Sequence, residues 1–134
     1  METRGSTAGA PTVLIVEDEE LLALSTREAL RDVAINAITA ASGAEALDVF
    51  ASYPFHAAII DIGLPDMPGT ELARHFRRRH ADLPIVLCSG FDCTGYVVEF
   101  RNDSRVRVIE KPFDEPHLLA QLLALGVPVG SSIA

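Results

Sequence analysis

The sequence is poor in cysteine and in long apolar runs, and each shortage excludes a class of protein. Its 134 residues contain two cysteines, Cys88 and Cys93. Their spacing fits neither a zinc site nor a redox CxxC motif, so we expect two free thiols in a reducing compartment. No apolar run reaches the length of a membrane span, and the N-terminus lacks the basic and apolar segments of a signal peptide. We therefore expect a cytoplasmic protein without a membrane association.

Basic residues are also scarce. Eleven Lys and Arg residues oppose 19 Asp and Glu residues, which gives a formal net charge of −8. A dedicated nucleic-acid binder needs clustered cations to contact phosphates, so the charge argues against this function. One basic run exists, Arg77–Arg79 followed by His80. It lies where we expect a helix to end, and we interpret it as a solvated helix end whose charge complements the helix dipole.

The chain has the length of one domain. Residues 1–11 are rich in small residues without periodicity and predict a flexible leader, residues 12–126 form the domain, and residues 127–134 form a short C-terminal tail. Five apolar runs predict strands at Thr12–Val16, Ala34–Ala40, His56–Ile60, Pro84–Cys88 and Val106–Ile109. A helical pattern follows each strand, and the fourth of these, over Thr94–Phe100, is poorly defined.

Local signals mark where two of the helices begin and where one ends. Ser42 and Glu45 have the spacing of a capping box at a helix N-terminus. Asp114 is expected to cap the last helix, and Gly126 to end it. Alternating strands and helices predict an α/β protein with a doubly wound parallel sheet. We expect a flavodoxin-like (βα)5 fold with strand order 2-1-3-4-5.

Ionisable and hydroxyl side chains stand at the carboxyl ends of four predicted strands. Glu17 and Asp18 follow the first strand, Asp61 the third, Ser89 the fourth and Lys111 the fifth. In the expected strand order, the first and third strands are neighbours at the point where such sheets bind their ligands. These side chains are therefore predicted to converge on one pocket.

Three carboxylates at close range repel one another unless a cation joins them. Mg²⁺ suits such a site, because it takes one or two carboxylates and shares its remaining positions with water and phosphate oxygens. Lys111 is the only lysine beside ten arginines, which indicates a position that needs a compact ammonium. Taken singly, each residue could be an ordinary turn former, helix cap or surface group. Together they predict phosphoryl transfer to a carboxylate.

The chain resembles the receiver domain of bacterial response regulators. The resemblance rests on Val13–Glu19, Asp61–Gly69, Pro84–Gly90 and Glu110–Phe113, and it covers residues 12–125. It implies that Asp61 is the phosphoacceptor. It further implies that Asp18 binds Mg²⁺ directly, that Glu17 acts through a metal-bound water, and that the carbonyl of Gly63 is a further ligand.

The resemblance also assigns roles to two residues that follow later strands. Ser89 would hydrogen-bond the phosphoryl group, and Lys111 would pair with one of its oxygens, its position fixed by a cis bond to Pro112. The partners implied are a histidine kinase or a histidine phosphotransfer domain, together with an unknown downstream protein. We expect no DNA-binding output domain in this chain, and no enzyme activity beyond its own phosphorylation and dephosphorylation.

Three alternative functions compete with this one. A haloacid dehalogenase-like phosphatase needs a second Asp two residues after its nucleophile, where this chain has Gly63. A flavodoxin needs a first loop rich in Ser, Thr and Gly to hold phosphate, whereas this loop is acidic. The third alternative is a degenerate receiver that binds partners without phosphorylation. It stays open because receivers often have Tyr or Phe three residues before the lysine, where this chain has Val108.

Overall fold

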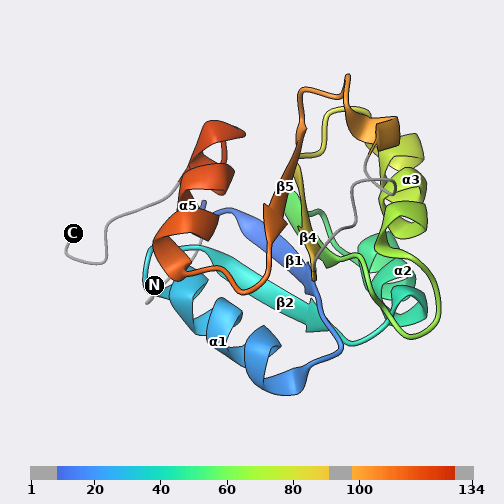
Figure 1. The fold of residues 1–134 in the computed structure, drawn as a ribbon. Helices are drawn as coiled ribbons and strands as arrows, with labels where there is room; N and C mark the ends of the chain where they lie inside the picture. Colours follow the sequence, from blue (N-terminus) through green and yellow to red (C-terminus); the bar gives the residue numbers. More distant parts are fainter. Residues whose placement is uncertain (1–8, 91–97, 129–134) are drawn as a thin grey trace.

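The computed structural model describes residues 9–90 and 98–128, which form a parallel sheet of five strands with helices on both faces (Figure 1). The strands are β1 (Thr12–Val16), β2 (Asn36–Ala40), β3 (Ala57–Asp61), β4 (Ile85–Ser89) and β5 (Val106–Glu110). The helices are α1 (Glu20–Arg31), α2 (Gly43–Ser52), α3 (Gly69–Arg79), the short 3₁₀ turn η1 (Val98–Phe100) and α5 (Glu115–Ala124). The strand order β2-β1-β3-β4-β5 confirms the predicted fold.

The sheet separates two apolar clusters. Helices α1 and α5 cover one face, and α2 and α3 cover the other (Figure 1). The central strands β3 and β4 are buried throughout, whereas the edge strands β2 and β5 are largely half-buried or exposed. Continuous apolar runs in the central strands are therefore explained by burial on both faces.

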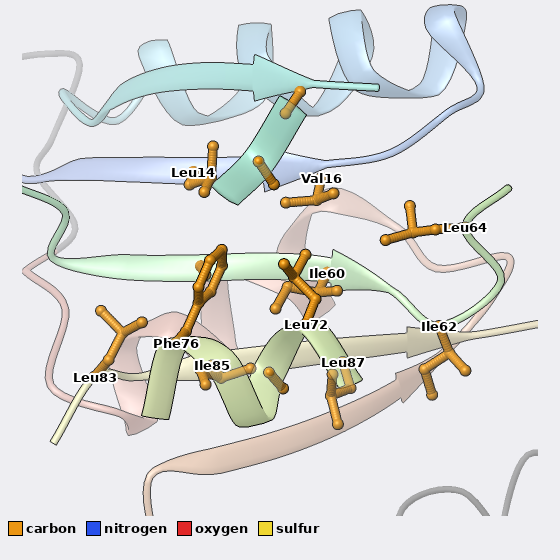
Figure 2. Packing of buried hydrophobic residues seen from close by; sticks show 14 of the residues in the cluster. Leu14, Val16, Ile60, Ile62, Leu64, Leu72, Phe76, Leu83, Ile85 and Leu87 are labelled. Atoms are coloured by element: carbon orange, nitrogen blue, oxygen red, sulfur yellow. The ribbon is translucent and has the colours of Figure 1, made fainter. Parts of the chain in front are cut away.

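Helix α3 contributes Leu72 and Phe76 to one of these clusters and packs against the sheet through them. Leu72 and Phe76 lie on its inner side and point toward β1 and β3 (Figure 2). The ring of Phe76 stacks on that of Phe50 from α2, with their centroids 4.1 Å apart. The two helices α2 and α3 thus share an aromatic contact over the same face of the sheet.

The basic residues at the end of α3 were predicted to be solvated, and one of them is not. Arg78, Arg79 and His80 lie at the surface, as expected of a solvated helix end. Arg77 is half-buried, and its guanidinium donates to a carboxylate oxygen of Asp103 at 2.9 Å and to the Leu83 carbonyl at 2.7 Å. The prediction is wrong for this residue, because Arg77 joins the end of α3 to the segments that precede β4 and β5.

The second strand begins two residues later than predicted. Ala34 has a left-handed backbone with φ of 64°. Its N–H donates to the Arg31 carbonyl, and the Ile35 N–H donates to the Leu30 carbonyl. This Schellman arrangement ends α1, so Ala34 and Ile35 belong to the helix cap and not to the strand. The other strands match their predicted bounds to within one residue.

The predicted helix caps are present. The Ser42 hydroxyl accepts from the Glu45 N–H, and Glu45 accepts in turn from the Ala41 N–H at 2.8 Å. The reciprocal bond of this box thus reaches one residue before the N-cap. Asp114 caps α5 by accepting from His117, and Gly126 ends α5 with φ of 90°.

Several predictions concern residues that lie outside the described part of the chain. These are most of the leader and tail, Cys93, and residues 94–97 of the predicted fourth helix. The described end of that helix, Val98–Phe100, is a 3₁₀ turn. Within the described ranges, no helix has both the length and the apolar composition needed to cross a membrane.

Candidate functional site

The acidic residues meet at the carboxyl ends of β1 and β3. Val16 is the register partner of Ile60, so the residues that follow them, Glu17 and Asp61, lie next to each other. Both are buried, with 7% and 8% of their surface exposed, whereas Asp18 is exposed. Oxygens from all three carboxylates lie within 4.8 Å of one another, close enough to share a metal ion. The structure therefore brings together the three predicted metal-binding side chains.

Lys111 reaches the same cluster from beyond β5. Its Nζ lies 2.8 Å from Glu17 Oε1 and 3.3 Å from Asp61 Oδ2. Strand β4 separates β5 from β3, so the long lysine side chain spans the end of an intervening strand. The backbone at this point is held by a bond from the Lys111 N–H to the Ser89 carbonyl at 2.7 Å, and the predicted cis bond to Pro112 is present.

The electrostatics of the cluster reflect its burial. Desolvation raises the pKa of Glu17, and the charge of Asp61 adds to this rise, while hydrogen bonds from Lys111 and the Glu19 N–H oppose it. Desolvation alone would lower the pKa of Lys111, but its bonds and attraction to Glu17 and Asp61 outweigh that effect and raise it. Lys111 is therefore a charged ammonium that offsets part of the acidic charge.

The remaining predicted residues lie at the same edge of the sheet. The Gly63 N–H donates to Asp61 Oδ1 at 3.1 Å. Ser89 ends β4, one residue after Cys88, the register partner of Asp61, and it is 4% exposed. Among the described residues, a cavity of about 690 Å³ beside Asp61 is lined by residues 61–68, Gly90 and Lys111, but not by Ser89. The cavity thus opens over Asp61 and the loop that follows it.

The loop between β3 and α3 contains a contact that the sequence did not reveal. Asp66 accepts from the backbone N–H groups of Gly43 and Ala44 at the start of α2, at 2.9 Å each. These bonds lower the pKa of Asp66 below its ordinary value. No local pattern predicts this contact, because its partners are more than 20 residues away. Asp66 lies within the Asp61–Gly69 motif of the resemblance, which assigns it no role.

Val108, which occupies the position where receivers often have an aromatic ring, lies on the edge strand β5. It is 42% exposed. The neighbouring residues of the alternating strand, Arg107 and Ile109, face the opposite side of the sheet. Val108 thus offers no ring that could swing between a buried and an exposed position.

Comparison with known proteins identifies the family. The family model for the response regulator receiver domain matches residues 13–123. The chain therefore belongs to the response regulator receiver domain family, the signalling module of two-component systems. This agrees with the resemblance of the sequence motifs and with the strand order.

Individual relatives extend this assignment. The sensor kinase CckA of Brucella abortus is 31% identical over 108 residues, which are 79% of this chain and 11% of CckA. The cell cycle response regulator CtrA of Brucella ovis is 29% identical over 84% of this chain and 49% of CtrA. The chain thus spans less than half of the length of these relatives. A receiver protein from Sinorhizobium medicae has a TM-score of 0.80 at 28% identity, over 88% of this chain and 95% of that one.

Proposed function

We propose that this chain accepts a phosphoryl group on Asp61 in a magnesium-dependent reaction and relays the signal to a partner protein. The observation that carries the proposal is the single cluster of Asp61, Glu17, Asp18 and Lys111 at one edge of the sheet. The donor would be a phosphohistidine on a histidine kinase or a histidine phosphotransfer domain. Membership of the receiver family and the match to a protein named a sensor kinase support this class of partner.

The donor set fits Mg²⁺. Carboxylate oxygens are the hard ligands that this ion prefers. Two of the three carboxylates are buried, and burial raises the pKa of Glu17, so a divalent cation would stabilise their charged forms. Glu17, Asp18 and Asp61 would hold the ion, with the Gly63 carbonyl as a further ligand. When bound, Mg²⁺ supplies positive charge next to the phosphoryl oxygens.

The protein's own residues account for the rest of the chemistry. A carboxylate oxygen of Asp61 forms the new bond to phosphorus while the bond from phosphorus to the donor's imidazole nitrogen breaks, and that nitrogen keeps the electron pair. Lys111, which already contacts Asp61 Oδ2, would pair with a phosphoryl oxygen. Ser89 would donate its hydroxyl to another. The protein would catalyse no reaction beyond its own phosphorylation and dephosphorylation.

Intact-mass analysis after incubation with acetyl phosphate and Mg²⁺ tests the proposal. The wild type is expected to gain one phosphoryl group, and Asp61→Asn none. Asp48→Asn, the same change at an exposed carboxylate of α2, is the matched control and should label like the wild type. Labelling of the Asp61→Asn variant at the normal rate would contradict the proposal. An unlabelled wild type would favour the phosphorylation-independent interaction module instead.

A further inference from the structure

The N-terminus of α2 is completed by a residue from another element. Gly43 and Ala44 are the first two residues of this helix, and their N–H groups have no partner within it. Asp66 Oδ1 accepts from Gly43 and Oδ2 accepts from Ala44, both at 2.9 Å. Ser42 caps the next free N–H, that of Glu45. The carboxylate therefore spans two amides at the end of the helix that favours negative charge.

An apolar contact lies beside this polar one. A Cβ added to Gly43 would stand 2.6 Å from the Cγ and Sδ atoms of Met67, so the Met67 side chain rests directly on the backbone of α2. At the far end of the same loop, the Gly69 N–H donates to the Ile62 carbonyl at 2.8 Å. The loop is thus fastened to α2 through Asp66 and Met67, and to the end of β3 through Gly69.

Gly63 lies in this loop between its fixed points and has no side chain that could anchor it. Its N–H nevertheless points at the site, where it donates to Asp61 Oδ1 at 3.1 Å. Among the described residues, a Cβ at Gly63 would meet one atom within 4 Å, Asp61 Oδ1 at 3.9 Å. Beyond this bond, we expect the direction of the Gly63 backbone to depend on how the rest of the loop is held.

We propose that Asp66 is a positioning residue, which fastens the loop to α2 and thereby keeps the Gly63 N–H directed at the carboxylate of Asp61. The lowered pKa of Asp66 agrees with this role, because the ionised carboxylate has two oxygens free to accept. The proposal rests on the proposed function, in which Asp61 accepts the phosphoryl group and Gly63 is a backbone ligand. It adds a residue outside the acidic cluster that sets the geometry of that cluster.

Three variants separate this role from helix capping. Asp66→Ala removes both acceptors, and Asp66→Asn keeps one acceptor oxygen but turns an amide NH₂ toward the other N–H. Ser42→Ala is the matched control, because it uncaps the same helix at Glu45 without touching the loop. All three are expected to destabilise α2. Only the two changes at Asp66 should weaken the hydrogen bond from the Gly63 N–H to Asp61.

The readout is exchange of the Gly63 amide proton with water, measured by NMR on the protein without metal. In Asp66→Ala, loss of the Asp66 bonds should speed this exchange about tenfold, which corresponds to the free energy of one charge-assisted hydrogen bond. In Asp66→Asn the exchange rate should rise less. Ser42→Ala should leave it near the wild-type rate. An unchanged Gly63 rate in Asp66→Ala, or an equal change in Ser42→Ala, would overturn the proposal.

Labelling with acetyl phosphate is followed in the same variants. The labelling rate should fall further in Asp66→Ala than in Ser42→Ala, because the loop carries the Gly63 backbone that faces Asp61. Equal rates in the two variants would overturn the role in phosphorylation. A wild type that takes up no phosphoryl group would reject the proposed function, and the Gly63 exchange rates would still decide whether Asp66 positions the loop.

Discussion

Replacing Gly69 with alanine tests whether the close packing of the start of α3 against the backbone of Asp61, the candidate phosphoacceptor, is needed. Gly69 is the first residue of α3. A Cβ at this position would lie 2.8 Å from the Cα of Ile62 and 2.9 Å from the carbonyl carbon of Asp61, and closer still to the Asp61 carbonyl oxygen. All of these are backbone atoms, so no side-chain rotation can relieve the overlap. The start of α3 or the end of β3 must move.

The size of the effect follows from two opposing contributions. Overpacking at a tightly packed site costs about 1–3 kcal/mol. Alanine restricts the unfolded chain more than glycine does, and this stabilises the folded protein by about 0.4–1 kcal/mol. We therefore expect Gly69→Ala to lower the free energy of unfolding by about 1–2 kcal/mol, a loss that a domain with a stability of about 5–15 kcal/mol survives. Because the shift falls on Asp61 itself, the labelling rate with acetyl phosphate should drop by about tenfold or more.

Urea denaturation followed by circular dichroism measures the first effect, and intact-mass kinetics measure the second. Gly63→Ala is the stability control, since the nearest described atom to its added Cβ is 3.9 Å away. Its free energy of unfolding should rise by about 0.4–1 kcal/mol, because only the restriction of the unfolded chain acts at this position. If Gly69→Ala unfolds at the same urea concentration as the wild type and labels at the same rate, the close approach of α3 to Asp61 is not a constraint on the site.

Three further predictions concern the end of α1, the metal site and the buried thiol. Ala34→Gly should raise the free energy of unfolding by about 0.5–1 kcal/mol in urea denaturation, because glycine relieves the left-handed backbone of residue 34; an unchanged or lower value would contradict it. Asp18→Asn should weaken Mg²⁺ binding in a calorimetric titration without unfolding the protein, and an unchanged affinity would reject Asp18 as a ligand. Burial raises the pKa of the Cys88 thiol to about 12, so at pH 9 a Cys93→Ser protein should react with iodoacetamide in urea but hardly at all when folded. The same shift should make the folded state lose stability as the pH rises above the ordinary thiol pKa, and fast labelling of the folded protein would contradict both expectations.

The sheet and its acidic edge could be predicted because each depends on short-range signals. Apolar runs of about five residues indicated the strands, and the polar residue that follows each run indicated the edge. In a parallel sheet all carboxyl ends lie on one side, so Glu17, Asp61 and Lys111 could be brought together without an alignment. The strand order then determines which of these side chains lie in contact, and the structure has the order expected for a flavodoxin-like sheet.

The features that the sequence did not predict depend on contacts between distant segments or on rare backbone states. Asp66 has the composition of an ordinary turn residue, and its role at α2 depends on residues 22 and 23 positions earlier. Ala34 adopts a conformation that alanine seldom takes, so nothing in its identity marks the end of α1. Arg77 belongs to a basic run, and only the packing of α3 against the segment before β5 distinguishes it from Arg78.

Lys111, the only lysine in the sequence, offsets part of the negative charge of the site. Glu17, Asp18 and Asp61 supply three carboxylates, and Lys111 supplies one ammonium that already contacts two of them. Two formal negative charges are left over in a partly buried pocket, where uncompensated charge is costly. In the proposed function a divalent cation would neutralise this remainder and the space beside it would be left for the phosphoryl group. A compact ammonium on a long stem would take less of that space than a planar guanidinium. The scarcity of lysine elsewhere in the chain, which uses arginine at its other basic positions, is therefore consistent with a requirement at this position for reach, compactness and a single charge.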